Sequence, residues 1–184
     1  VGFDMYSQML NEAIQAKKEG KTYEEIKPFE VELALNVNAY IPHDYIKDET
    51  QKIQMYKRIH AIEDESDIFD LKDELLDRFG PYPDEVDQLL QVAKIKLYAR
   101  REKIESIDER RNKIELIMHD SESSKIDGAE LLNLANEYQR MVQLATEGKK
   151  LKITLQFSKQ DYDRRYDILE DFLSKLKQTK KMAG

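Results

Sequence analysis

The spacing of the apolar residues changes along this chain, and that change constrains the fold more than any other feature. Between residues 49 and 101, apolar side chains recur at the three- to four-residue spacing of helices that bury one face. Beyond residue 104, short segments instead alternate apolar and polar residues, which predicts half-buried strands. Helices and strands that occupy separate stretches predict an α+β fold, mostly helical with a small antiparallel sheet.

The predicted helices share apolar stripes and recognisable ends. They span residues 4–20, 49–62, 68–79, 83–101, 128–142 and 158–177. Asp48 is placed to cap the second helix, and Ser66 or Asp67 the third, because short polar side chains accept hydrogen bonds from the first free amides. Gly80 and Pro81 end the third helix, since glycine tolerates the left-handed conformation and proline cannot continue a helix.

Alternating segments and helical stripes also predict the strands and the core. Strands are predicted at residues 29–40, 104–108, 113–119 and 151–157, with a polar loop at 120–124. The apolar face of the helix at 68–79 is expected to consist of Ile68, Leu71, Leu75, Leu76 and Phe79. The side chains expected to pack together across the turn at Gly80 are Leu71, Leu75, Phe79, Leu89 and Leu90.

The composition argues against several classes of protein. The chain has 184 residues, with 37 acidic and 30 basic side chains and a formal charge of −7. It contains no cysteine, which excludes disulfides, thiolate catalysis and cysteine-bound zinc. No apolar run of about 18 residues and no secretory signal is visible, so we expect a cytoplasmic protein that does not contact a membrane. A pI near 5.2 disfavours a dedicated nucleic-acid-binding protein.

Candidate catalytic and ligand-binding motifs are incomplete. Gly20-Lys21-Thr22 resembles the end of a phosphate-binding loop, but Gln15 stands where that loop needs a glycine, and a helix precedes it instead of a strand. The histidines are not at metal-ligand spacing from one another; they are His43, His60 and His119. We therefore expect no catalytic residue, no metal site and no cofactor in this chain.

One helix carries a more specific feature on the side opposite its apolar stripe. The acids on this side of the helix at 68–79 are Asp70, Asp73, Glu74 and Asp77. Glu74 and Asp77 are three residues apart and therefore adjacent on the helix surface, where like charges repel each other. A solvated surface explains such acids in many soluble proteins. The alternative is a docking face for an arginine-rich partner surface.

Three sequence runs together resemble a known family. They are residues 40–46 (YIPHDYI), 56–59 (YKRI) and 73–83 (DELLDRFGPYP). In this order they are similar to the C-terminal (TRCF) domain of bacterial transcription-repair coupling factors, the Mfd family. Residues 2–13 resemble the segment that leaves the second motor lobe in that family. The resemblance predicts a helical segment at residues 1–28 and a regulatory domain at residues 29–184.

The resemblance implies a role within a larger protein. Members of this family are ATP-dependent DNA translocases of the helicase superfamily, which displace stalled RNA polymerase and recruit UvrA for nucleotide excision repair. ATP and magnesium belong to the motor lobes, which are absent from this chain. The C-terminal domain is not catalytic: it packs on the UvrB-like N-terminal module, covers the UvrA-binding surface and so restrains the protein. Glu74 and Asp77 match acidic positions of that contact.

Two other functions remain open at this point. The chain could be a stand-alone nucleic-acid-binding or adaptor module that uses Arg100, Arg101, Arg110 and Arg111, although its acidic pI disfavours this. It could also be a small enzyme that uses His43 or paired carboxylates, which would require a pocket with a perturbed acid or histidine.

The incomplete phosphate-binding loop generates the first prediction. We expect the chain to show neither saturable ATP binding nor ATP hydrolysis, because no row of glycine-rich backbone amides is available to hold the phosphates. Isothermal titration calorimetry with ATP and magnesium measures this directly. A dissociation constant in the micromolar range would contradict the prediction.

Overall fold

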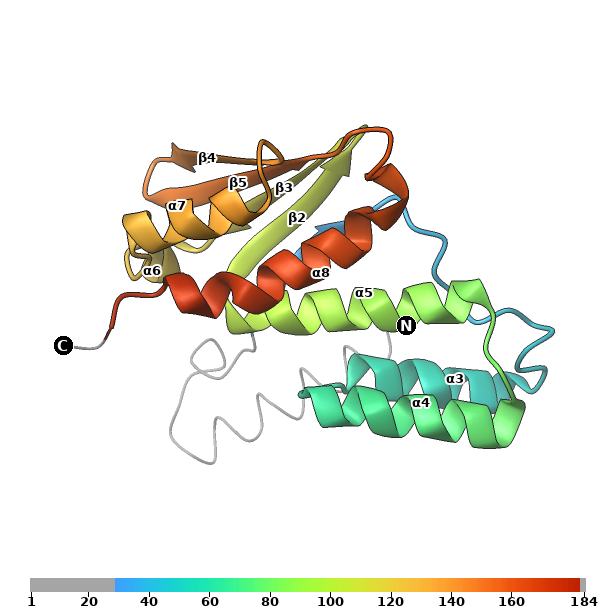
Figure 1. The fold of residues 1–184 in the computed structure, drawn as a ribbon. Coiled ribbons are helices and arrows are strands. Elements are labelled where there is room, and N and C mark those ends of the chain that lie inside the picture. The colour runs from blue at the N-terminus through green and yellow to red at the C-terminus, as the bar shows by residue number, and fades with distance from the viewer. Residues whose placement is uncertain (1–28, 183–184) are drawn as a thin grey trace, which may run out of the picture. The chain divides into compact units, whose positions relative to one another are not determined.

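The fold combines a helical hairpin, formed by the two helices within residues 49–79, with an open sheet. In a computed structural model of the chain, residues 29–182 are described, and residues 1–28 and 183–184 are not (Figure 1). The helical segment predicted at residues 1–28 therefore lies outside the described residues. The helices are α3 (Glu49–His60), α4 (Glu65–Phe79), α5 (Asp84–Arg101), α6 (Asp120–Ser123), α7 (Gly128–Glu137) and α8 (Arg165–Lys175), with short 3-10 turns at Tyr162–Arg164 and Leu176–Thr179. Among the described helices, none combines the length and apolar character that crossing a bilayer requires.

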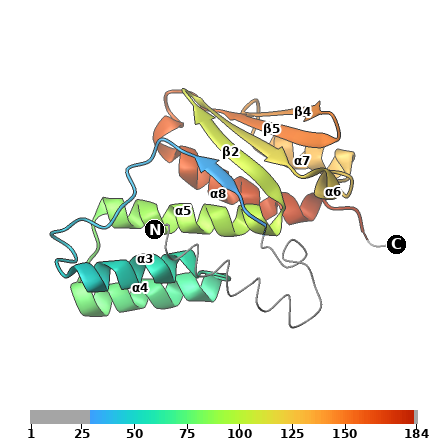
Figure 2. The same cartoon turned by 180° about the vertical axis from the view of Figure 1, so that it is seen from behind.

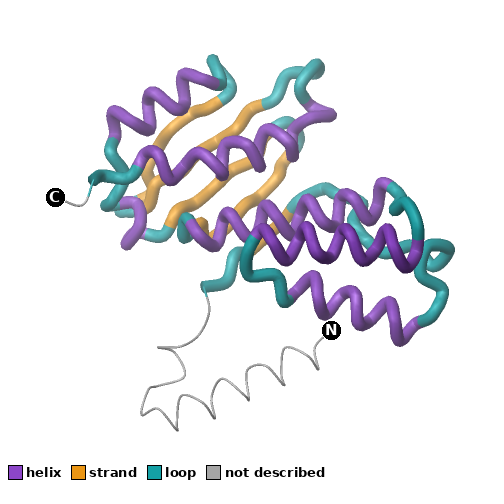
Figure 3. Tube along the Cα trace, turned by 60° about the horizontal axis from the view of Figure 1, so that its bottom comes forward, coloured by secondary structure: helices purple, strands orange, loops and turns teal. Residues whose placement is uncertain are grey.

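Within residues 29–182, five strands form one sheet. They are β1 (Glu32–Ala34), β2 (Ile104–Arg110), β3 (Lys113–Met118), β4 (Val142–Glu147) and β5 (Lys150–Gln156), in the order β1-β2-β3-β5-β4. All neighbouring strands are antiparallel except β1 and β2, which are parallel. Helices α7 and α8 lie on one face of the sheet, and in the view from behind no helix of residues 29–182 lies over the strands of the opposite face (Figures 2 and 3). The predicted α+β class, with a small and mostly antiparallel sheet, is confirmed.

The strand predicted at residues 29–40 is shorter than expected. Side chains alternate between inward and outward as far as Tyr40, but only Glu32–Ala34 pairs with β2. At Asn36, side chains replace the strand partner: the Asn36 N–H donates to Glu109 Oε1 at 2.9 Å, and Arg165 Nη2 donates to the Asn36 carbonyl at 3.3 Å. The parallel pairing and this early end were not visible in the periodicity alone.

Several element ends also differ from the predictions. Helix α4 begins at Glu65, and its N-cap is Asp64 and not Ser66 or Asp67; Asp67 instead completes a capping box by accepting from the Asp64 N–H. The expected loop at 120–124 contains the short helix α6. The helix predicted at 158–177 is α8 with a 3-10 turn at each end. Asp48 caps α3 as predicted, and Gly80 ends α4 with a positive φ of 81°.

One strand was missed entirely. The helix predicted at 128–142 ends at Glu137, and residues 142–147 form β4 at the edge of the sheet. Gln139 adopts a positive φ of 58° in the turn between them. No glycine or proline marks that turn, so the sequence carried no signal that the helix stops there.

The core of the helical part lies between α3, α4 and α5. Its buried side chains are Ile41, Ile46, Met55, Ile62, Ile68, Leu71, Leu75, Val86, Leu90 and Leu97, and the half-buried Phe79 and Leu89 pack against them. The core positions predicted around Gly80 are therefore confirmed. Leu76, which was predicted on the apolar face of α4, is not part of the core: it is 45% exposed, whereas its neighbour Leu75 is 1% exposed. Adjacent helical residues point about 100° apart, so Leu76 cannot share the inward direction of Leu75.

Two tyrosine hydroxyl groups tie the loop before α3 to the helical hairpin. The Tyr45 hydroxyl donates to the carbonyls of Gly80 at 2.8 Å and Leu75 at 3.2 Å, which satisfies acceptors at the C-terminal end of α4. The Tyr56 hydroxyl of α3 accepts from the Ile41 N–H at 2.8 Å. These bonds hold residues 41–45 of the YIPHDYI run against the hairpin, which gives a structural reason for Tyr45.

A buried ion pair joins the sheet to α8. The Glu109 side chain is 1% exposed and accepts from Arg165 Nε at 2.8 Å and from the Tyr166 hydroxyl. The Arg165 guanidinium stacks between the Tyr162 and Tyr166 rings, at 4.2 and 4.4 Å from their centres. Burial, reinforced by the bond to Glu109, raises the pKa of Tyr166 above its usual range. The Glu109 carboxylate thus accepts hydrogen bonds from Asn36, Arg165 and Tyr166, and these bonds offset the cost of burying its charge.

The contrast between Leu75 and Leu76 gives a stability prediction. Leu75→Ala should lower the free energy of unfolding by roughly 2–5 kcal/mol, because it leaves a cavity in a packed core. Leu76→Ala, a matched change one residue away, should stay within about 0.5 kcal/mol of the wild type, as surface substitutions usually do. Urea denaturation of the 184-residue chain measures both. Equal losses in the two variants would contradict the orientation of α4.

The buried ion pair gives a second stability prediction. Arg165→Met should cost about 3–5 kcal/mol, since it leaves the Glu109 carboxylate buried without its charge partner. The adjacent Arg164→Met is the control. The 66%-exposed Arg164 side chain pairs, among the described residues, only with Asp161 at the surface and should contribute at most about 1 kcal/mol. Thermal melts of both variants test this. If the double variant Glu109→Gln/Arg165→Met regains much of the lost stability, the loss in Arg165→Met comes from the unpaired buried carboxylate.

Candidate functional site

The candidate site is the outward side of α4. The helix is anchored by its capping box at Asp64 and Asp67 and by the buried stripe of Ile68, Leu71 and Leu75. These contacts fix the rotation of α4, and therefore which of its side chains face solvent. A rigid helix held in this way presents its outer residues in a constant arrangement, which favours recognition by a second surface.

Three of the four predicted acids lie together on this side. Asp70, Asp73 and Asp77 are exposed, and none of them forms an ion pair with any residue in the described range 29–182. They follow one another at three- and four-residue spacing, so they line one strip of the helix surface. Their charges are therefore available to an external partner.

Glu74 occupies a different environment. It is half-buried, and its Oε2 accepts from Arg58 of α3 and from Arg78, one turn further along α4, at 3.1 Å. The carboxylate therefore faces the neighbouring helix and neutralises two cations of the same domain. The sequence placed Glu74 with the other three acids, whereas the structure separates it from them.

Two large apolar residues complete the outer side of α4. Phe69 is 62% exposed and Leu76 is 45% exposed. With Asp73 they share a strip, because positions 69, 73 and 76 recur at helical spacing. We call the set Phe69, Asp70, Asp73, Leu76 and Asp77 the α4 outer face. Sequence reasoning overlooked Phe69 and assigned Leu76 to the core. The signal was available in the helical phase. At about 100° per residue, Phe69 and Leu76 point to one side of the direction shared by Ile68, Leu71 and Leu75.

The α4 outer face has the character of a protein-docking surface. Exposed large apolar side chains within a polar rim are a recurrent property of interaction sites. The acids would complement arginine or lysine side chains, and the phenylalanine and leucine would fill an apolar patch between them. No group of three or more His, Asp or Glu residues in the described part of the chain is arranged to hold a metal ion.

His43 and His119 lie in separate surroundings in the structure. His43 Nδ1 lies 3.9 Å from Glu49 Oε1, and both side chains are largely exposed. His119 caps α6, where its Nδ1 accepts from the Ser121 N–H at 3.1 Å. An open cleft between the C-terminal ends of α5 and α8 is lined by residues such as Tyr98, Arg101 and Lys175. That cleft contains neither His43 nor the acids of the α4 outer face.

The arginines considered for a nucleic-acid site are not brought together as one set. Arg100 and Arg101 end α5, just before β2 begins, whereas Arg110 ends β2 and Arg111 follows it. A seven-residue strand spans about 20 Å, at roughly 3.3 Å for each residue. The two pairs therefore lie at opposite ends of β2.

The comparisons with known proteins decide the family. A family model described as the TRCF domain matches residues 35–129. The chain belongs to this family. The TRCF domain is the C-terminal domain of transcription-repair coupling factor, so the resemblance found in the sequence runs is confirmed. The matched range includes α3, α4 and α5, and with them the whole α4 outer face.

Curated relatives agree with the TRCF assignment. The chain is 44% identical over 183 residues to the transcription-repair-coupling factor of Bacillus subtilis, a match that covers 100% of this chain and 15% of the relative. It is 39% identical over 163 residues to that of Staphylococcus haemolyticus, covering 89% of this chain and 14% of the relative. The chain thus spans about one seventh of the length of these relatives.

A solved structure shares the fold of this TRCF domain. It is described as the crystal structure of the C-terminal domain of transcription-repair coupling factor. The two folds align with a TM-score of 0.76 at 24% sequence identity, over 84% of this chain and 96% of the other. At that identity the likeness supports the architecture alone.

Proposed function

We propose that this TRCF domain is the non-catalytic regulatory domain of an ATP-dependent DNA translocase that displaces stalled RNA polymerase and recruits UvrA in transcription-coupled nucleotide excision repair. In this proposal the domain docks on the UvrB-like N-terminal module of the same parent protein and covers its UvrA-binding surface. The parent acts in the cytoplasm, and its motor lobes hold ATP and magnesium. The observation that carries the proposal is the α4 outer face.

The composition of the α4 outer face suits an interface that must open again. Exposed ion pairs contribute only about 0.2–1 kcal/mol each, and salt screens them. Burying the exposed parts of Phe69 and Leu76 would add about 25 cal/mol for each Å² removed from water. A handful of such contacts sets a conformational equilibrium of a few kcal/mol, which the engagement of RNA polymerase could reverse.

Glu74 has a supporting role in this proposal. Without its carboxylate, Arg58 and Arg78 would place two uncompensated cations beside the acids of the α4 outer face. Glu74 neutralises them and so keeps this side of the domain negative toward an arginine-rich partner. Asp73 and Asp77 are free to contact the partner directly, because their charges are not engaged within the described domain.

The proposal predicts that reversing the free acids releases UvrA binding. In the full-length parent protein, Asp73→Lys/Asp77→Lys should increase UvrA capture in a pull-down without polymerase, because like charges across an interface can cost several kcal/mol. Glu74→Gln should have a smaller effect, since it alters the charge balance and not a direct contact. A melting curve of each variant verifies that the domain still folds.

The matched control makes the same change of charge elsewhere. Glu130→Lys/Asp163→Lys also replaces two exposed acids, one on α7 and one just before α8. Figure 1 shows α7 and α8 beside the sheet, away from α4. This control should leave UvrA capture unchanged. Equal capture by wild type, Asp73→Lys/Asp77→Lys and the control, with folding intact, would remove the α4 outer face from the proposed contact.

A further inference from the structure

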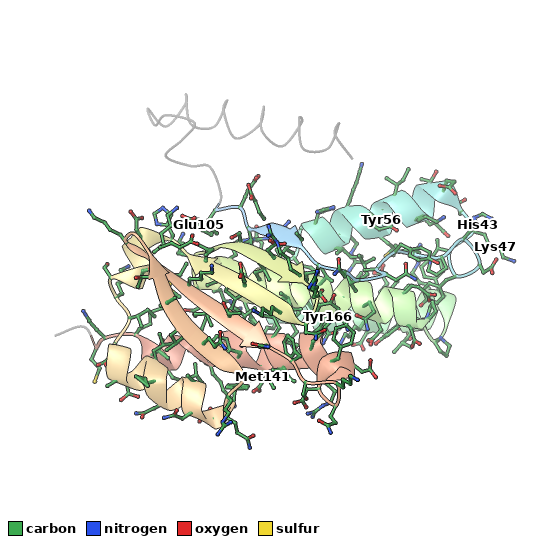
Figure 4. The ribbon with its side chains drawn as sticks, turned by 90° about the horizontal axis from the view of Figure 1, so that it is seen from above. His43, Lys47, Tyr56, Glu105, Met141 and Tyr166 are labelled. Carbon is green, nitrogen blue, oxygen red and sulfur yellow. The ribbon has the colours of Figure 1, made fainter. Side chains whose placement is uncertain are left out.

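One end of the sheet gathers three segments that are far apart in sequence. They are the β2–β3 turn, the turn that precedes β4 and the loop between β5 and α8. The Phe157 N–H donates to the Asn112 carbonyl at 2.9 Å, and the Gln156 N–H donates to the Met141 carbonyl at 2.8 Å, so all three segments meet at this end. Figure 4 shows Met141 and Tyr166 near this end, away from Glu105 at the start of β2.

Exposed cations accumulate on these segments. They are Arg110, Arg111, Lys113, Arg140, Lys159 and Arg164, which we call the basic sheet end. Arg110 pairs with Asp108 at 2.9 Å, and Arg164 pairs with Asp161 at 2.6 Å. The third nearby acid, Glu109, is buried and already neutralised by Arg165.

The remaining charges at the basic sheet end are strongly unequal. Its other four cations form no ion pair with any residue of the described part; they are Arg111, Lys113, Arg140 and Lys159. On the same segments, only one further acid is exposed in the described structure, Asp163. This end is therefore positive in a chain whose formal charge is −7. A local field of this kind attracts a polyanion even where the net charge would repel it.

We propose that the basic sheet end binds the phosphate backbone of duplex nucleic acid without reading its sequence. Neighbouring strands lie about 4.8 Å apart, so the distance from β2 across β3 and β5 to β4 is about 14 Å. Duplex DNA carries one negative charge for roughly every 1.7 Å of its axis, so several phosphates fall within that span. Arginine contributes fork-shaped donors that match phosphate oxygens.

An acidic protein surface fits this end less well. The large apolar side chains exposed in the described structure lie elsewhere; they are Tyr40, Ile53, Phe69, Leu76, Leu132 and Met182. Protein interfaces generally have an apolar centre, whereas contacts to phosphates require only well-placed charges and donors. The cations of the basic sheet end lie in turns, in loops and at strand ends. Their contacts to phosphates would position a duplex without selecting its bases.

The salt dependence of binding tests the proposal. Fluorescence anisotropy of a labelled duplex of about 20 base pairs should show binding by the 184-residue chain at low salt. With about three phosphate contacts, affinity should fall on the order of 100-fold between roughly 25 and 150 mM salt. Two duplexes of unrelated sequence should bind equally. Absence of binding at the lower salt concentration, or a strong preference between the duplexes, would overturn the proposal.

Charge reversals locate the site. Arg111→Glu/Lys159→Glu should weaken binding at least about tenfold and reduce the salt slope by about two, because each lost phosphate contact lowers it by about one. The control Lys47→Glu/Lys149→Glu changes the net charge equally, on the loop before α3 and in the β4–β5 turn at the opposite end of the sheet. It should bind within about twofold of the wild type, since long-range effects of exposed charges are screened.

Three outcomes would overturn the assignment. Equal losses of duplex affinity in the two double variants would show that binding depends only on the net charge of the chain. Full binding by Arg111→Glu/Lys159→Glu would place the site elsewhere. Displacement of the duplex by poly-L-glutamate at equal charge would identify an acidic polypeptide as the better partner. Melting curves confirm folding, and Arg111→Gln/Lys159→Gln replaces the reversal if that variant does not fold.

Discussion

The two-sided burial of α5 is the constraint on which the rest of the structure depends. Val86, Leu90 and Leu97 belong to the core shared with α3 and α4, whereas Ile95 and Ala99 are also completely buried. Opposite sides of α5 pack against the helical hairpin and against α8 and β2, so this one helix joins the two halves of the domain. A helix that is buried on two opposite sides cannot rotate without exposing apolar side chains. Its position therefore fixes the rotation of α4, and with it the side chains that α4 presents outward.

Local signals in the sequence predicted most of the helices and the central strands, while tertiary contacts decided the rest. Gly80 and Asp48 set helix ends through their own backbone or side chain, so their effects were predictable. The early end of β1 depends on Arg165, more than a hundred residues away, and no local pattern encodes that contact. The same applies to the site: the exposure of the free acids followed from helical phase, but the engagement of Glu74 by Arg58 required the packing of α3 on α4.

The two proposed surfaces have opposite charge and lie on different parts of one compact unit. The α4 outer face is negative and includes two exposed large apolar side chains, whereas the basic sheet end is positive and carries none in the described structure. An average over the whole composition hides this division, because a pI near 5.2 describes only the sum. Surface charges separated by more than about 8 Å are largely screened at physiological salt, so the two surfaces can act independently.

The hydrogen bonds that Glu109 and Arg165 form with the Asn36 backbone also limit self-association of this domain through its sheet edge. An open sheet edge is a template on which another chain can add a strand, and long flat edges are hazardous for that reason. In the described structure, the edge strand β1 has three residues paired with β2. The chain after β1 is held by the side chains of Glu109 and Arg165 instead of continuing as a strand. An incoming strand would find too few aligned partners on this side. The buried ion pair that joins sheet and helix thus also shortens the surface on which aggregation could begin.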